Sequence, residues 1–206
     1  MKNRYDIAGA QGRFEPGSSD TVLANRLGIS DPFDIADAEL VLLQQLYQAV
    51  LVEAFPDRRL TVQDLKDWHR RWLGNVYDWA GEERSVNMSK GDFHFAAAAQ
   101  VSRLLQQFEQ ACLVKYTPCH GLAIESLIEA IAVTHVELIL IHPFREGNGR
   151  LSRLLSDVMA VQAGVGPLDY SAWDQDRNGY FAAIQHGAAM NYAPMVDKVR
   201  QALGRT

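Results

Sequence analysis

Apolar residues recur every three or four positions along most of this 206-residue chain, the spacing that lines one face of an α-helix. The run from about Leu122 to Ile141 has more apolar positions than one face can hold, which predicts a buried central helix. His135 lies within it, and we interpret it as a core histidine. The same spacing predicts further helices at residues 21–27, 34–55, 61–73, 96–114, 150–163, 171–187 and 193–203.

The pattern changes between residues 85 and 95. Val86 and Met88 alternate with polar neighbours, and the following Lys90-Gly-Asp can make a tight turn, so we expect a short β-hairpin here. Residues 1–33 are broken by glycine and proline, and we predict an irregular arm packed on the core. The predicted fold class is therefore all-α with one hairpin, in a single domain over residues 34–206.

Composition narrows the class of protein. Hydrophobic residues make up 48% of the chain and charged residues 22%, as in an ordinary soluble domain, and the net charge of −5 argues against direct nucleic acid binding. The chain has two cysteines, Cys112 and Cys119, which are too few for a disulfide framework and are not spaced as metal ligands. This usage suits a protein of a reducing compartment. We expect neither a membrane span nor a signal peptide, and predict a cytoplasmic protein or one delivered into another cell.

The candidate chemistry is concentrated in residues 142–153. His142 can accept a proton near neutral pH. Four residues later, Glu146 offers a hard oxygen ligand suited to Mg²⁺, with Mn²⁺ as a second option. Taken singly, each of these two residues could equally be structural, so the interpretation depends on the residues that follow them.

The next residues favour binding of an anion. Gly147, Asn148 and Gly149 supply backbone that can take unusual dihedral angles, and they lie at the start of a predicted helix, where the helix dipole attracts phosphate. Arg150 and Arg153 fall on one face of that helix and can each bind phosphate oxygens. The alternative is an ordinary turn between helices, which would leave these charges unrelated. Taken together, the residues predict a nucleotide phosphate site.

Residues 142–153 read His-Pro-Phe-Arg-Glu-Gly-Asn-Gly-Arg-Leu-Ser-Arg. They resemble the signature of the Fic/Doc family, His-x-Phe-x-Asp/Glu-Gly-Asn-Gly-Arg-x-x-Arg, and every fixed position matches. The resemblance implies a Fic-type helical bundle with a hairpin flap over the active site. It also implies a protein adenylyltransferase, which transfers AMP from ATP to a Tyr, Thr or Ser hydroxyl of a target protein.

The resemblance gives each residue of the motif a role. His142 would take the proton of the target hydroxyl, and Glu146 would hold Mg²⁺ between the α- and β-phosphates. Asn148 and the glycine N–H groups would hold the α-phosphate, Arg150 the β-phosphate and Arg153 the γ-phosphate.

Other residues receive roles from their place relative to this motif. The hairpin at 85–95 is similar in position to the Fic flap, which holds the target as an added strand. Lys90 and Phe93 would then face the target or the nucleotide. Phe144 would anchor the motif in the core, and Tyr180 would either contact the base and ribose or pack in the core.

The sequence leaves two alternatives to protein adenylyl transfer open. The same fold could transfer another phosphate-containing group (UMP, phosphate or phosphocholine), or the chain could bind a nucleotide without catalysis.

Many Fic proteins carry an inhibitory pattern, Ser/Thr-x-x-x-Glu-Gly/Asn, whose glutamate pairs with the second motif arginine. Here only Glu146 precedes Gly or Asn, and His142 stands where the Ser or Thr should be. We therefore expect a small separate inhibitory antitoxin protein, with an unrestrained enzyme as the alternative.

Overall fold

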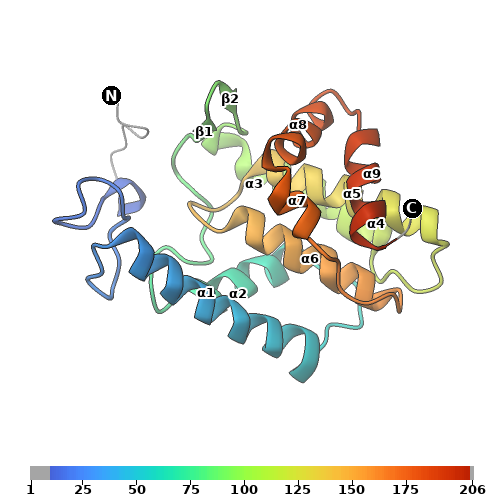
Figure 1. Cartoon of the computed structure of the whole chain (residues 1–206), viewed down its shortest axis with the longest axis horizontal. Coiled ribbons are helices and arrows are strands. Elements are labelled where there is room, and N and C mark those ends of the chain that lie inside the picture. The colour runs from blue at the N-terminus through green and yellow to red at the C-terminus, as the bar shows by residue number, and fades with distance from the viewer. Residues whose placement is uncertain (1–9, 205–206) are drawn as a thin grey trace.

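The computed structural model describes residues 10–204 (Figure 1). They form a helical fold with one two-stranded antiparallel sheet, which confirms the predicted fold class. The principal helices are α1 Pro32–Gln48, α2 Val62–Leu73, α3 Val101–Phe108, α4 Val114–Tyr116, α5 Ile124–Ile141, α6 Asn148–Gln162, α7 Ser171–Gln175, α8 Arg177–Gly187 and α9 Ala193–Ala202. Four short helical turns are η1 Ala10–Gly12, η2 Ala49–Glu53, η3 Ala98–Gln100 and η4 Glu109–Leu113, and the strands are β1 Ser89–Lys90 and β2 Phe93–His94.

Helix α5 occupies the centre, as its apolar pattern predicts. It packs against α3, α6, α8 and α9, and its residues Ala130, Ile131 and Val136 are fully buried. The pair α1–α2 covers the other side of α6, and the hairpin stands beside α8 (Figure 1). Because α5 ends where the motif begins and α6 starts within it, the two best-packed helices fix the motif in space.

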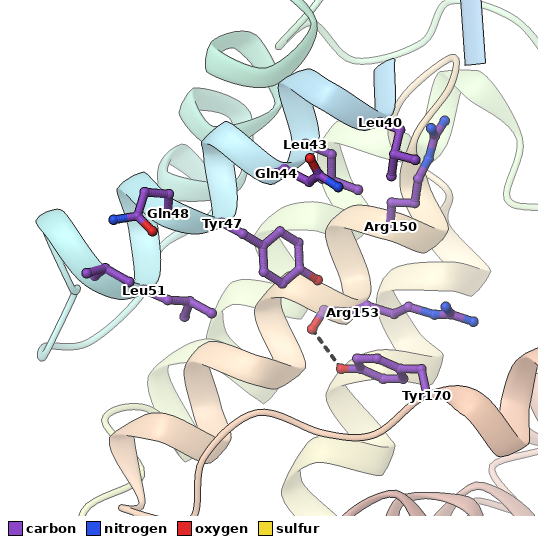
Figure 2. A pocket seen from close by; sticks show the side chains of 10 residues that line it. Leu40, Leu43, Gln44, Tyr47, Gln48, Leu51, Arg150, Arg153 and Tyr170 are labelled. Atoms are coloured by element: carbon purple, nitrogen blue, oxygen red, sulfur yellow. Dashed lines mark hydrogen bonds between the residues drawn. The ribbon is translucent and has the colours of Figure 1, made fainter. Parts of the chain in front are cut away.

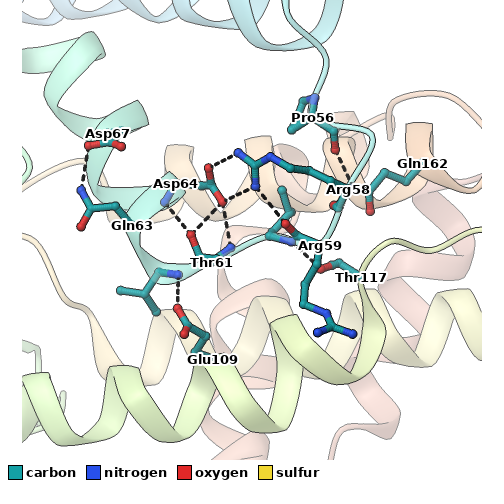
Figure 3. Close-up of polar contacts among 12 residues, drawn as sticks. Pro56, Arg58, Arg59, Thr61, Gln63, Asp64, Asp67, Glu109, Thr117 and Gln162 are labelled. Carbon is teal, nitrogen blue, oxygen red and sulfur yellow. Dashed lines mark hydrogen bonds and ion pairs between the residues drawn. The ribbon is translucent and has the colours of Figure 1, made fainter.

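Local capping explains where α1 and α2 begin. The Asp31 carboxylate accepts hydrogen bonds from the N–H groups of Phe33 and Asp34, and Pro32 follows at the first helical position. Thr61 and Asp64 form a reciprocal capping box at the start of α2 (Figure 3). Arg58 binds the Asp64 carboxylate through both of its terminal nitrogens (Figure 3). This second contact holds the loop after α1 against the start of α2.

The helix predicted at 21–27 is wrong. The Asn25 side chain binds the backbone of Leu27 and Ile29, and such local bonds compete with the helical pattern. Leu23 instead pairs with Phe14 in an isolated antiparallel bridge. The arm therefore returns on itself, and of the predicted arm 1–33 only residues 10–33 lie within the described part.

Two other predicted helices are interrupted, and the one expected over 34–55 ends in the π-helical turn η2. The one expected over 171–187 breaks at Asp176, which has φ −112° and ψ 64°, and whose carboxylate accepts from the N–H of Gly179 to cap α8. The one expected over 96–114 begins with the 3₁₀ turn η3 and contains the π-helical turn η4 before α4. Spacing of apolar residues predicts the helical stretches but does not detect a side chain that caps a new helix inside them.

The membrane expectation needs a correction. The continuous helical run Pro32–Glu53 has 22 residues and a mean hydropathy of 1.3, so by length and composition it could cross a membrane. In this fold one face of the run is buried, including Ile35, Leu46 and Val50, and α1 packs against α2. Only 28% of its most apolar window is buried, whereas a core helix is mostly buried, so the absence of a membrane span stays a prediction.

Candidate active site

His142 ends helix α5 in a left-handed conformation, with φ 52° and ψ 58°. This region is uncommon for residues other than glycine, and it turns the ring back toward its own helix. Nδ1 lies 3.2 Å from the carbonyl oxygen of Ile139, which can only accept, so Nδ1 carries the proton and Nε2 keeps its lone pair. Burial, with Arg84 and Lys90 nearby, lowers the pKa of His142 to about 4. The ring is therefore neutral at pH 7, the state that a proton acceptor requires.

The two glycines of the motif differ in how much space surrounds them. Gly147 has φ 80°, and a Cβ there would lie 2.6 Å from the Trp72 ring, so both backbone and packing require glycine. A Cβ at Gly149 would meet nothing within 4 Å. The space beside Gly149 is therefore open, and a phosphate could approach the backbone there.

Asn148 closes the loop rather than pointing into that space. Its side-chain oxygen accepts from the Phe144 N–H at 2.9 Å, and its nitrogen donates to the Phe144 carbonyl at 2.7 Å. Its predicted contact with the α-phosphate would then come from its backbone N–H. The first intrahelical bond of α6 runs from Leu151 to Gly147, so the N–H groups of residues 148–150 precede it at the positive end of the helix.

Both motif arginines are paired with carboxylates from other elements. The Arg150 guanidinium lies 2.7 Å from the buried Glu39 on α1 and 3.3 Å from Glu146. Arg153 binds Asp174 on α7 through two nitrogens, at 2.7 and 3.3 Å. Asp174 is 52% exposed, so that ion pair is open to solvent and to competing anions.

Comparison with known proteins decides what this arrangement is. Residues 59–160, which run from before α2 to near the end of α6, match the family described as Fic/DOC family. A probable protein adenylyltransferase Fic of Salmonella typhimurium is 32% identical over 149 residues, covering 69% of this chain and 70% of that protein. The chain belongs to the Fic/DOC family.

Two further likenesses extend over most of this Fic/DOC chain. A probable protein adenylyltransferase of Sinorhizobium fredii is 26% identical over 180 residues, covering 87% of this chain and 90% of that protein. The crystal structure of a VirB-translocated effector from Bartonella tribocorum with bound AMPPNP has a TM-score of 0.74 at 23% identity. It covers 93% of this chain and 96% of that one, so the two share the fold.

A buried histidine on α2 contacts two residues of the Fic/DOC motif. His69 on α2 accepts at Nδ1 from the Gly81 N–H, so Nε2 carries the proton that it donates to the Glu146 carbonyl at 3.1 Å. Its ring stacks on Phe144, with centroids 4.0 Å apart. Phe144 is buried, which agrees with the predicted role of a core anchor.

The hairpin forms as predicted and lies against α8. Ser89 pairs with His94, and Lys90 pairs with Phe93. The Lys90 ammonium lies 4.2 Å from the centre of the Phe181 ring, and Phe93 packs edge-on against the same ring. The face of the flap that holds Lys90 and Phe93 is therefore turned toward α8, and their contacts with target or nucleotide remain predictions.

Tyr180 is engaged within the core. Its hydroxyl lies 2.8 Å from Nε2 of His135, and its ring stacks on Trp173 at 5.2 Å. His135 is fully buried and also contacts the hydroxyl of Ser152 at 2.9 Å, as expected of a core histidine with its polar atoms satisfied. Of the two predicted roles for Tyr180, the structure supports packing, and a nucleotide contact remains a prediction.

The metal prediction rests on a single carboxylate. In the part of the chain that the structure describes, no group of three His, Cys, Asp or Glu side chains could hold a metal ion. Glu146 is 44% exposed, and its Oε1 accepts from the Gly147 N–H. This fits Mg²⁺, which is commonly held by one or two carboxylates together with water and substrate phosphates rather than by a full protein cage.

A groove of about 640 Å³ runs from the motif arginines along α1 (Figure 2). One wall is apolar, with Leu40, Leu43, Leu51 and Val52 from the α1 side, and Arg150 and Arg153 lie on the α6 side. Tyr170 closes part of it, with its hydroxyl donating to the Arg153 carbonyl (Figure 2).

The sequence prediction missed three residues of this site. Glu39 directly precedes the apolar run 40–43 of α1, a signal that could have marked it as a buried partner for an arginine. Asp174 and His69 carry no such signal, because each acts through a partner far along the chain, Arg153 and Glu146 respectively.

Proposed function

We propose that this chain is a protein adenylyltransferase that transfers AMP from ATP to a hydroxyl side chain of a target protein. The observation that carries the proposal is the placing of a neutral His142, with Nε2 unprotonated, next to the N-terminus of α6. Arg150 and Arg153 stand on the same helix. Curated relatives with this family fold are described as protein adenylyltransferases, which agrees with the geometry.

The proton chemistry is assigned to His142. As the target hydroxyl attacks the α-phosphorus, its O–H bond breaks and the proton moves to Nε2. The new P–O bond forms while the bond to pyrophosphate breaks, and pyrophosphate carries away the electron pair. General-base help of this kind is typically worth about 10²–10⁴-fold in rate. A bound triphosphate adds negative charge beside the ring and raises the pKa of His142 from its low value toward the working range.

The phosphates are assigned to the start of α6. The backbone N–H groups of residues 148–150 point out of the helix end and receive the α-phosphate through the open space at Gly149. Arg150 binds the β-phosphate while its guanidinium stays paired with the Glu39 carboxylate. Arg153 leaves its ion pair with Asp174 and binds the γ-phosphate instead. Glu146 would hold Mg²⁺, which would neutralise charge on the phosphates.

Mass spectrometry tests this proposal. The purified chain is incubated with ATP, Mg²⁺ and a lysate, and modified proteins are isolated and fragmented. The proposal predicts an AMP group on a Tyr, Thr or Ser side chain. Addition of UMP, phosphate or phosphocholine, when the corresponding donors are supplied, would favour the second candidate function. Binding of ATP with no modified protein would favour a non-catalytic module.

The groove between α1 and α6 supports the proposed inhibitory partner. Its apolar wall fits the apolar face of a helix, and its basic end fits a carboxylate on that helix. We assign it to a small separate protein that places an acidic residue on Arg153. No Ser/Thr-x-x-x-Glu-Gly/Asn pattern occurs in the chain to do this from within.

Co-expression with the neighbouring reading frame tests the partner. Val52→Lys should release it, because Val52 lines the groove and is 68% exposed. Val41→Lys is the matched control, since Val41 is exposed on the same helix but lies outside the groove. Equal co-purification with both variants, or with neither, would reject the groove as its site.

A further inference from the structure

Arg84 is buried without a carboxylate. Its side chain is 2% exposed, and within residues 10–204 no ion pair involves it. Burial lowers the pKa of its guanidinium to about 10, so it still carries its charge at neutral pH. A buried charge is costly unless hydrogen bonds compensate it, which makes its partners informative.

Those partners are carbonyl oxygens from two separate segments. Nε donates to the His142 carbonyl at 2.5 Å, and Nη2 donates to the Ile141 carbonyl at 3.1 Å. Nη1 donates to the Val86 carbonyl at 2.5 Å, and Nη2 also donates to the Ala96 carbonyl. One side chain therefore binds the end of α5 and both ends of the flap segment.

The contact with α5 is a cap. The last carbonyls of a helix have no partner within it and carry the negative end of its dipole. Arg84 meets them with a positive charge and several donors, at the residue that is held in the left-handed conformation. Its backbone N–H also donates to the Pro143 carbonyl at 2.8 Å. The strained backbone of His142 is thus fixed on both sides.

The flap segment that Arg84 binds is itself in contact with the end of α5 and with the His142 ring. The Ala96 N–H donates to the Leu140 carbonyl, and the Phe95 ring stacks on the His142 ring with centroids 3.8 Å apart. The flap and the proposed base therefore share one anchor.

We propose that Arg84 is a positioning residue for the transfer reaction: by binding the end of α5 and both ends of the flap, it fixes His142 relative to the edge that receives the target hydroxyl. The inference rests on the proposed function of the motif. Arg84 does not touch the reacting groups and acts through the backbone of His142.

Steady-state kinetics of Arg84→Lys and Arg84→Met test it. Lysine keeps the charge and some of the donors, whereas methionine keeps only the bulk. Misplacing a reacting group by about 1 Å costs on the order of 10²-fold in rate, so kcat should fall by up to that factor for methionine and by less for lysine. The affinity for ATP, measured by titration, should change by less than about three-fold, because the phosphate site on α6 has no contact with Arg84.

Gln162→Met is the matched control. Gln162 is also a buried side chain that binds backbone, donating to the carbonyls of Pro56 and Arg58 at 2.7 and 2.8 Å, but at the far end of α6 (Figure 3). It should lower thermal stability with little effect on kcat.

The measurements distinguish a positioning role of Arg84 from a merely structural one. Selective loss of kcat at Arg84, partly restored by lysine, supports the inference. Parallel loss of kcat and ATP affinity, or an equal loss of kcat in Gln162→Met, makes Arg84 a merely structural residue and overturns it. If methionine prevents folding, unchanged kcat in the lysine variant overturns it as well. Absence of transfer by the wild-type chain would instead reject the proposed function.

Discussion

The carboxylate of Glu39 on α1 lies 2.7 Å from the guanidinium of Arg150 on α6. Glu39 also accepts from the Tyr77 hydroxyl at 2.7 Å, and its backbone carbonyl accepts from the Trp72 indole. The acid is therefore held from three sides, and Arg150 is oriented before any nucleotide arrives. Preorganisation of this kind costs no rearrangement at the moment of reaction.

Glu39→Gln tests this orientation. The amide can keep the Tyr77 contact but loses the charge that holds Arg150, so kcat should fall on the order of 10-fold. Binding of ATP, measured by titration, should be no weaker, because the carboxylate also competes with phosphate for Arg150. Glu53→Gln, in the exposed ion pair with Arg71, is the control and should behave as wild type. Weaker ATP binding in Glu39→Gln would contradict the assigned role.

Asp174→Asn tests the competition at Arg153. The ion pair is exposed, and exposed pairs are worth roughly 0.2–1 kcal/mol, so freeing Arg153 should tighten ATP binding by at most about five-fold. The gain should shrink as salt is added. Asp197→Asn, which breaks an exposed pair with Arg200, should leave the affinity unchanged. Weaker binding in Asp174→Asn would show that Asp174 helps to hold the nucleotide.

Gly149→Ala should separate stability from activity. A Cβ there has open space and lies within α6, so alanine should raise the free energy of unfolding by about 0.5–1 kcal/mol. The same methyl group would stand where the phosphate approaches, and transfer should fall by at least about 10-fold. Denaturant titration and a transfer assay measure the two effects. Full activity in a stabilised variant would move the phosphate away from this backbone.

Acid should destabilise the fold through buried neutral histidines. Burial lowers the pKa of His69 to about 4, and the unfolded chain binds that proton near pH 6.5. The stabilisation is thus complete above pH 6.5 and is lost as the pH falls toward 4. His69→Gln should reduce the slope of unfolding free energy against pH by roughly 1.4 kcal/mol per unit in that window. Comparing the two proteins cancels opposing groups such as Asp157, whose pKa burial raises to about 6. Equal slopes would show that His69 is not buried as a neutral ring.

The sequence predicts much of this molecule because its signals are local. Apolar spacing marks α5 and α6, the Thr61–Asp64 spacing marks the start of α2, and the motif places His142, Glu146 and the arginines within twelve residues. The remaining site residues could not be predicted because they act across long separations. Arg84 reaches His142, 58 positions away, and His69 reaches Glu146, 77 positions away. Asn148 shows a second limit, since its side chain serves the loop, which spacing alone does not reveal.

In the proposed reaction, His142 drives transfer of the α-phosphate of ATP, with its nucleoside, to a protein hydroxyl. Transfer from α-labelled and γ-labelled ATP should be measured side by side, with wild-type protein and with His142→Ala, and ATP binding should be recorded for both. We expect label on protein from α-labelled ATP alone, and its loss by about 10²-fold or more in His142→Ala with ATP still bound. Label from γ-labelled ATP, or undiminished transfer by His142→Ala, would contradict it.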